Sequence, residues 1–186
     1  MKKFHHITIL LTSVIVIMCF ACTSSKKETE KKVSQFMGDT LKLPEKTEVL
    51  YKDSLYKKKF MLANKATLKI PTLLWGECHS CIADLKKWDE FYQFIKEKDN
   101  VTVLFYLYTS DLKFFRKSLY KKEIHKYPFI VDRNNRYLDN NDLPFKNKMY
   151  QTFLLDSNNR VILVGNPVYN DNLMKLYKEE INKRVK

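Results

Sequence analysis

Glycine and proline are scarce in this chain, with three and five residues among 186. Such a composition argues against a collagen-like or low-complexity protein. Acidic residues are also few, because 21 of them stand against 34 lysines and arginines, which gives a formal charge of +13. A basic chain can bind nucleic acid or an anionic membrane. Here lysines alternate with acids, as in Lys96-Glu97-Lys98, which favours solvated helix surfaces, and we expect no nucleic-acid partner.

The N-terminal apolar run is short. It spans Ile7 to Ala21, fifteen residues, whereas a transmembrane helix needs roughly 20. Because it follows a positively charged start, it is typical of a secretory signal peptide. The end of the run, Cys19-Phe20-Ala21-Cys22, resembles a bacterial lipoprotein signal, in which the cysteine after a small residue is acylated, for example with palmitate.

This resemblance implies a signal peptide over residues 1–21, a lipid anchor on Cys22, and a place in the cell envelope, on the periplasmic face or the cell surface. An ordinary signal peptide cut nearby is the alternative. If Cys19 leaves with the leader and Cys22 carries lipid, Cys78 and Cys81 are the remaining pair. They then lie in a compartment where disulfides can persist.

The segment after Cys22 lacks apolar residues from Thr23 to Lys32, so we expect residues 22–35 to form a solvated tether. Residues 36–66 carry modest apolar patches and are interpreted as an N-terminal extension with short strands. Within it, Thr40 to Pro44 alternates like an edge strand. The main domain is expected over residues 67–186.

The main domain begins with two β-prone runs that flank a helical pattern. Thr67 to Trp75 predicts a buried strand in which Pro71 indicates an edge position or a bulge. Val101 to Tyr108 predicts a strand covered on both faces. Between them, Cys81 to Lys98 predicts a helix, and one face of it repeats at helical spacing. That face comprises Cys78, Cys81, Leu85, Trp88, Tyr92 and Ile95.

Shorter elements follow in alternation. A helix over Leu112 to His125, after a cap at Ser110-Asp111, leads to a strand at residues 129–131. A helical turn over residues 137–143, a hairpin of residues 152–155 and 161–164, and a helix after Asn170-Asp171 complete the chain. The last helix is expected to turn Leu173, Leu176, Tyr177 and Ile181 inward. This order predicts an α/β sheet with helices on both faces.

The chemistry-bearing motif is Cys78-His79-Ser80-Cys81, where the first core strand turns into its helix. Thiol–disulfide exchange needs one thiolate that attacks and a second thiol within disulfide reach. Positions i and i+3 of a first helical turn meet that need, and the turn favours a thiolate on Cys78. A charged His79 would favour the same thiolate, and Glu77 would disfavour it.

Two other uses of the cysteine pair remain open. The pair could form a buried structural disulfide. It could also bind copper or zinc together with His79 or His125, although no second Cys-x-x-Cys supplies the four ligands that zinc prefers. We expect no bound cofactor and no resident metal.

The element order resembles the thioredoxin fold, and especially the membrane-tethered thioredoxin-like proteins of bacterial envelopes, which act in cytochrome-c maturation and related thiol reduction. The resemblance covers about residues 65 to 184. The residues that carry it are Trp75-Gly76-Glu77-Cys78-His79-Ser80-Cys81, Tyr127-Pro128-Phe129-Ile130-Val131-Asp132, Thr152-Phe153-Leu154-Leu155-Asp156 and Asn159-Arg160-Val161.

By this resemblance Cys78 attacks and Cys81 resolves, and the partners are protein thiols or disulfides together with a membrane electron donor. The flanking residues Trp75, Glu77, His79, Gln151 and Thr152 would modulate the pair. A peroxidase would show a threonine three residues before its reactive cysteine, where this chain has a tryptophan.

Two residues depart from the family pattern. The family has a cis-proline before its late strand, and here Gln151 takes that position. A cis bond without proline costs roughly 3 kcal/mol, so we expect Gln151 to be trans. The family also buries an acid in the strand before the motif, whereas this chain has Thr72 near that place. These departures leave open a thioredoxin-fold binding module without turnover, or a copper or zinc chaperone.

Overall fold

The structure is a computed structural model, and it describes residues 30–31, 33–44, 48–52, 54–57, 66–124, 126–143 and 147–185. The predicted signal peptide and Cys22 lie outside this part of the chain. The chain divides into two compact units, Met1–Phe36 and Met37–Lys186. In the first unit, residues 33–36 are helical. None of the helices in the described residues is long and apolar enough to span a membrane.

A mixed sheet forms the centre of the second unit. Within the described residues it has seven strands in the order β2-β1-β5-β4-β3-β6-β7. The strands are β1 (Glu48–Tyr51), β2 (Ser54–Lys57), β3 (Leu68–Trp75), β4 (Val101–Tyr108), β5 (Phe129–Val131), β6 (Phe153–Leu155) and β7 (Val161–Val164). The three strands β3, β4 and β5 run parallel to one another. The other neighbours pair antiparallel.

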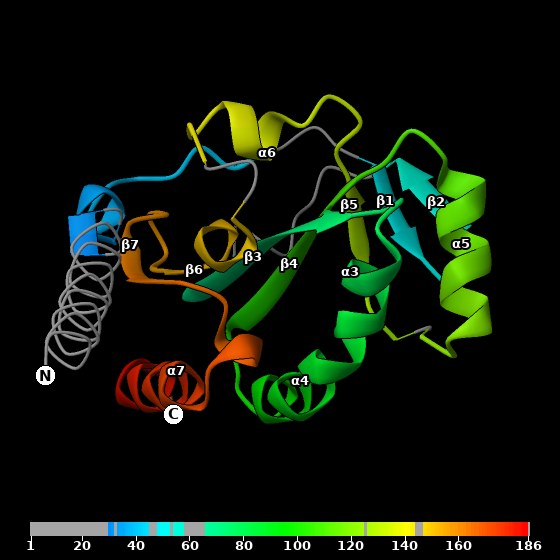
Figure 1. The fold of residues 1–186 in the computed structure, drawn as a ribbon. Coiled ribbons are helices and arrows are strands. Elements are labelled where there is room, and N and C mark those ends of the chain that lie inside the picture. The colour runs from blue at the N-terminus through cyan, green and yellow to red at the C-terminus, as the bar shows by residue number, and fades with distance from the viewer. Residues whose placement is uncertain are drawn as a thin grey trace, which may run out of the picture. The chain divides into compact units, whose positions relative to one another are not determined.

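Helices cover both faces of this sheet. They are α3 (His79–Asp84), α4 (Trp88–Lys96), α5 (Leu112–Lys121), α6 (Arg136–Asp139) and α7 (Asp171–Arg184), with 3₁₀ turns η1 (Leu85–Lys87), η2 (Lys148–Gln151) and η3 (Pro167–Tyr169). In Figure 1, α3, α4 and α7 lie on one side of the sheet and α6 on the other. The α/β fold with helices on both faces, expected from the sequence, is confirmed.

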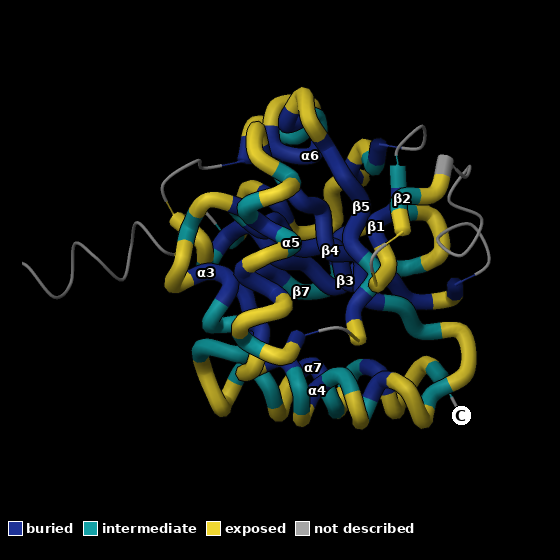
Figure 2. The backbone as a smooth tube through the Cα atoms, turned by 90° about the vertical axis from the view of Figure 1, so that its right-hand side faces the viewer, coloured by how far each residue is buried: buried dark blue, intermediate teal, exposed yellow. Residues whose placement is uncertain are grey.

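The core lies between the central strands and the helices that cover them. Phe105 in β4 packs against Trp88, with ring centroids 5.1 Å apart. Figure 2 shows the central strands in the colour of buried residues and much of α4 and α7 exposed. In α7, Tyr177 and Ile181 are fully buried as predicted. The prediction for Leu176 is wrong, because its side chain is 39% exposed.

Pro71 lies in a central strand, so the prediction of an edge or a bulge is wrong. Strand β3 pairs with β4 along its whole length, including Pro71 with Leu104. On its other side β3 pairs with β6 at Lys69, and Thr72 forms an isolated bridge with Thr152. The proline therefore stands in a gap of the second ladder, where a missing N–H is tolerated. The hydroxyl of Tyr137 shares its one proton between the carbonyl of Pro71, at 3.4 Å, and that of Gln151, at 3.2 Å.

Short strands from residues 48–57 extend the sheet. Strand β1 pairs with both β2 and β5, so this hairpin forms one end of the sheet. Thr40, by contrast, forms a single bridge with Arg160, where the sequence predicted an edge strand over residues 40–44. The backbone N–H of Leu41 donates to Asn159 at 3.0 Å, so this segment runs beside the β6–β7 turn.

Candidate redox site

Cys78 and Cys81 form a disulfide at the start of α3, with their Cα atoms 5.2 Å apart. Cys78 is the N-cap of this helix, and its sulfur accepts the backbone N–H of Cys81 at 3.2 Å. Cys81 is 5% exposed, whereas Cys78 is half-buried. The pair therefore combines a partly accessible Cys78 with a buried Cys81, and the disulfide confirms that positions i and i+3 are within disulfide reach.

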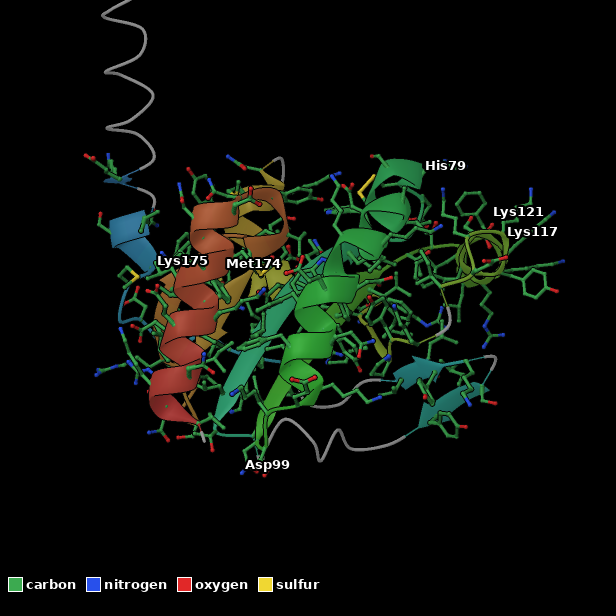
Figure 3. All side chains as sticks on the ribbon, turned by 90° about the horizontal axis from the view of Figure 1, so that it is seen from below. His79, Asp99, Lys117, Lys121, Met174 and Lys175 are labelled. Carbon is green, nitrogen blue, oxygen red and sulfur yellow. A yellow bond between two sulfur atoms is a disulfide. The ribbon has the colours of Figure 1, made fainter. Side chains whose placement is uncertain are left out.

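A tight turn after β3 places the motif. The N–H of Cys78 donates to the carbonyl of Trp75 at 3.2 Å, and the N–H of Gly76 donates to Tyr108 of β4 at 2.9 Å. The site therefore lies beyond the carboxyl ends of the parallel strands. Figure 3 shows the S–S bond beside His79 at one end of the second unit and Asp99, just before β4, at the opposite end of that unit.

Glu77 ties the motif to the start of α5. Its Oε1 accepts the hydroxyl of Thr109 at 2.9 Å, the N–H and hydroxyl of Ser110 at 2.6 and 2.9 Å, and the N–H of Asp111 at 3.1 Å. Desolvation alone would raise the pKa of Glu77, but these hydrogen bonds outweigh it, and the pKa is lowered. The carboxylate therefore acts as an anchor for the loop, a role that the sequence did not suggest.

Replacing Glu77 by glutamine is expected to lower the free energy of unfolding at pH 7 by about 1 kcal/mol, after discounting for solvent screening. Because the pKa is lowered by folding, the stabilisation is present above the unfolded pKa and is lost as the pH falls through the folded pKa. The variant should therefore show a shallower loss of stability below about pH 4.5. Urea unfolding between pH 3 and 7 measures this, with Glu97→Gln as the control. Parallel curves for Glu77→Gln and the unmodified protein would contradict the prediction.

His79 and Trp75 contact aromatic rings beside the motif. The ring of His79 meets Phe114 of α5 edge-on, with centroids 5.2 Å apart. Trp75 meets Tyr108 in the same manner at 5.0 Å, and it lines a cavity together with Cys81. Trp75 is therefore packed at the end of β3 and also lies beside the disulfide.

Gln151 and Thr152 face the core before β6. No peptide bond of the described residues is cis, so the bond before Gln151 is trans, as expected. The carbonyl of Gln151 accepts the hydroxyl of Tyr137 at 3.2 Å, and that of Thr152 accepts the N–H of Gly165 at 2.8 Å. Both carbonyls are thus already hydrogen-bonded within the fold.

Two threonine hydroxyls meet near the position at which the sequence resemblance led us to expect an acid. The Oγ1 atoms of Thr72 in β3 and Thr152 lie 2.7 Å apart, and both residues are buried. Thr72 also lines the cavity next to Cys81. This pair ties β3 to the start of β6 without a charge, so any proton transfer at Cys81 must use other groups.

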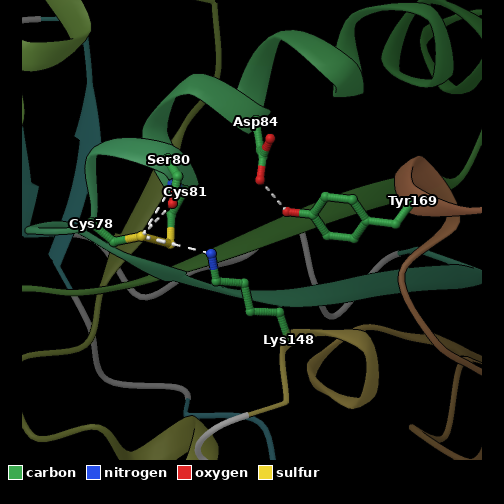
Figure 4. Close-up of a disulfide and its surroundings, with 6 residues drawn as sticks. All are labelled: Cys78, Ser80, Cys81, Asp84, Lys148 and Tyr169. Carbon is green, nitrogen blue, oxygen red and sulfur yellow. Dashed lines mark hydrogen bonds between the residues drawn. A yellow bond between two sulfur atoms is a disulfide. The ribbon is translucent and has the colours of Figure 1, made fainter.

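The sequence prediction missed three polar residues around the disulfide: Asp84, Lys148 and Tyr169. The ammonium of Lys148 lies 3.7 Å from the sulfur of Cys78, and all three residues line the same cavity as Cys81 (Figure 4). Asp84 accepts the hydroxyl of Tyr169 at 2.6 Å and pairs with Lys87 at 2.9 Å. The helical spacing 78–81–84 could have found Asp84, but no local signal points to Lys148.

Opposing effects act on the pKa of Asp84. Desolvation raises it, whereas the hydrogen bond from Tyr169 and the charges of Lys87 and Lys148 lower it, and the net pKa is lowered. Asp84 is therefore a carboxylate at neutral pH.

The structure shows no cluster of metal ligands in its described part. No three residues among the described His, Cys, Asp and Glu are grouped so that they could hold a metal ion. His125, which the sequence offered as a possible ligand, lies outside the described residues. His79 is packed on Phe114.

Several solved structures share this fold. No protein-family model matches the sequence, and no curated protein matches it. The thioredoxin domain of a thiol-disulfide oxidoreductase from Bacteroides vulgatus is 10% identical, with a TM-score of 0.55 over 78% of this chain and 98% of that one. A thiol:disulfide interchange protein from Bacteroides sp. is 12% identical, with a TM-score of 0.52 over 78% and 90%. The reduced 2-Cys peroxiredoxin of Plasmodium vivax is 16% identical, with a TM-score of 0.56 over 80% and 97%.

At these identities the similarity establishes the fold, which is thioredoxin-like. The chain combines that fold with a Cys-x-x-Cys disulfide at the start of its first core helix. The fold class predicted from the sequence is therefore confirmed.

Proposed function

We propose that the protein is a thiol–disulfide oxidoreductase of the cell envelope, which exchanges disulfides with protein substrates through Cys78 and Cys81. The observation that carries the proposal is the disulfide at the start of α3, with an accessible Cys78 above a buried Cys81. Similar structures whose names describe thiol–disulfide oxidoreduction or interchange support it.

The exchange runs through a mixed disulfide. In the reduced protein, the Cys78 thiolate attacks a substrate disulfide, and one substrate sulfur leaves as a thiolate that takes up a proton. Cys81 then loses its proton and attacks the Cys78 sulfur, which releases the second substrate sulfur and forms the Cys78–Cys81 disulfide. Two electrons have passed to the substrate, and a dithiol donor in the membrane returns two electrons to the pair.

The proposal includes the export of the protein and its attachment to a membrane. Residues 1–21 direct export, Cys22 carries the lipid, and residues 22–35 hold the domain away from the membrane surface. Support comes from the sequence of the leader and from the absence of apolar residues between Thr23 and Lys32. Mass spectrometry of Cys22 in the mature protein tests the lipid attachment.

Turnover and trapping test the enzymatic proposal. The full chain should accelerate the reduction of insulin by dithiothreitol, and the Cys81→Ala variant should accumulate a mixed disulfide between Cys78 and an insulin chain. The matched control is the variant that lacks both cysteines, which should trap nothing. A chain without turnover whose Cys81→Ala variant traps no partner would refute the proposal.

A binding module is the second candidate, and one observation favours it. The carbonyl of Gln151, which takes the position of the cis-proline, and the carbonyl of the next residue, Thr152, already accept hydrogen bonds from Tyr137 and Gly165. These two carbonyls are therefore less available to accept hydrogen bonds from a substrate peptide. If the Cys78→Ser variant keeps its full biological function, the module is favoured and the enzyme is not.

A further inference from the structure

Three described groups contact the sulfur of Cys78 as hydrogen-bond donors. They are the N–H of Cys81 at 3.2 Å, the hydroxyl of Ser80 at 3.2 Å and the ammonium of Lys148 at 3.7 Å. A disulfide sulfur carries no hydrogen, so the Ser80 hydroxyl must be the donor in its contact. Ser80 and Cys81 belong to the same helical turn as Cys78, whereas Lys148 comes from η2, 70 residues along the chain.

Lys148 also faces a carboxylate. Asp84 lines the same cavity, and the two opposite charges attract each other. Asp84 is itself held by Tyr169 and Lys87. In Figure 4 the ammonium group of Lys148 points to the disulfide, and Asp84 lies on the helix that follows Cys81, hydrogen-bonded to Tyr169. Lys148 is an exposed residue, and its ammonium group contacts the Cys78 sulfur at 3.7 Å while its charge also acts on Asp84.

We propose that Lys148 is a catalytic residue of this site, and that its ammonium group stabilises the sulfur anion of Cys78 during thiol–disulfide exchange. A cation gains little from the neutral sulfur of a disulfide, but it attracts the thiolate that forms when the pair is reduced. Lys148 therefore acts on the reduced state and increases the fraction of Cys78 that can attack.

The other charged groups near Cys78 do not supply this effect. The carboxylate of Glu77 is taken up by donors at the start of α5, and the ring of His79 rests on Phe114. Lys87 also lowers the pKa of Asp84, but it does so through an ion pair at 2.9 Å, and its ammonium group lies over the ring of Tyr169, 5.0 Å from the centroid. These positions make Lys87 a matched control for Lys148.

The test follows the alkylation of Cys78 by iodoacetamide in the reduced full chain between pH 5 and 9.5, read by tandem mass spectrometry at Cys78. Lys148→Met should slow the reaction at pH 6 by about threefold to fivefold. A positive charge within 4–6 Å lowers the pKa of a thiol, and the effect is smaller where water screens the charge. The difference should vanish near pH 9.5, where the thiol is ionised in both proteins. Lys148→Arg should stay within about twofold of the unmodified protein, and so should Lys87→Met.

Two outcomes would overturn the inference: equal rates for Lys148→Met and the unmodified protein at pH 6, or an equal loss in Lys87→Met, which would show a general charge effect. The inference rests on the proposed function for its place in exchange, but the two fail separately. If the unmodified protein reduces insulin but Lys148→Met does not change the alkylation profile, the proposed function stands and the role of Lys148 is refuted. If Lys148→Met shifts the profile but the unmodified protein does not reduce insulin, the role of Lys148 stands and the proposed function is refuted.

Discussion

The Cys78→Ser variant is expected to reduce insulin at least about a thousandfold more slowly than the unmodified chain, measured above the uncatalysed background. A serine hydroxyl stays protonated at neutral pH and cannot form a disulfide with the substrate, so both steps of the exchange fail. The fold should survive, because residue 78 is the N-cap of α3 and serine is among the preferred residues there. Stopped assays of insulin reduction and a thermal unfolding curve measure the two effects.

The remaining cysteines provide the controls. Cys81→Ser should retain the first attack and accumulate mixed disulfide, while Cys22→Ser should reduce insulin at the full rate. If Cys78→Ser keeps more than about a tenth of the activity, Cys78 is not the attacking residue, and the order of attack implied by the resemblance is wrong. If Cys22→Ser loses activity in solution, the exchange does not belong to the 78–81 pair alone.

Elements with local signals were predictable from the sequence. The β-prone run Val101 to Tyr108 has the bounds of β4, since its signal is the run itself. Asp111 accepts the N–H of Phe114 at 2.8 Å, and Asn170 accepts that of Leu173 at 3.0 Å. In each case the sequence signal and the contact lie within four residues, so the periodicity and cap rules apply directly.

Features set by distant partners were not predictable. Pro71 argued for an edge because a proline weakens a ladder, but the gap in the β3–β6 pairing and the hydroxyl of Tyr137 accommodate it. The helix expected over Cys81 to Lys98 is continuous in sequence pattern, yet a 3₁₀ turn at Leu85–Lys87 divides it into α3 and α4. Such local changes depend on tertiary packing, which a periodic pattern does not contain.

The residues of the site likewise fall into those with a local sequence signal and those placed by distant partners. Cys78 and Cys81 follow from their spacing in one helical turn. Lys148 does not, because its contact with Cys78 spans 70 residues and depends on where η2 crosses the end of the sheet. The sequence prediction for Glu77 considered only the effect of its charge on the Cys78 thiolate. In the structure Glu77 anchors the loop, and this depends on hydrogen-bond donors at Ser110 and Asp111, 33 and 34 residues away.

Gly76 is the position where one added methyl group should change the site most. A Cβ at residue 76 would lie 2.6 Å from the Cβ of Thr109, 2.7 Å from its Oγ1 and 3.2 Å from a methyl carbon of Leu107. Thr109 is buried, and its hydroxyl is held by Glu77, so it cannot turn away without losing that bond. We expect Gly76→Ala to lower the free energy of unfolding by about 3 kcal/mol, the upper range for an overpacked position.

Urea unfolding measures this loss, and a double-mutant cycle identifies its cause. Thr109→Gly removes both of the closest atoms, so the double variant should lose less stability than the sum of the single variants, with a coupling above about 1 kcal/mol. Additive losses would mean that Thr109 does not oppose the methyl group. If the free energy of unfolding of Gly76→Ala lies within about 0.5 kcal/mol of that of the unmodified protein, the turn after β3 moves freely to accept the methyl group. In that case the motif is not held against β4, and the position of Cys78 does not depend on the close approach of Gly76 to Thr109.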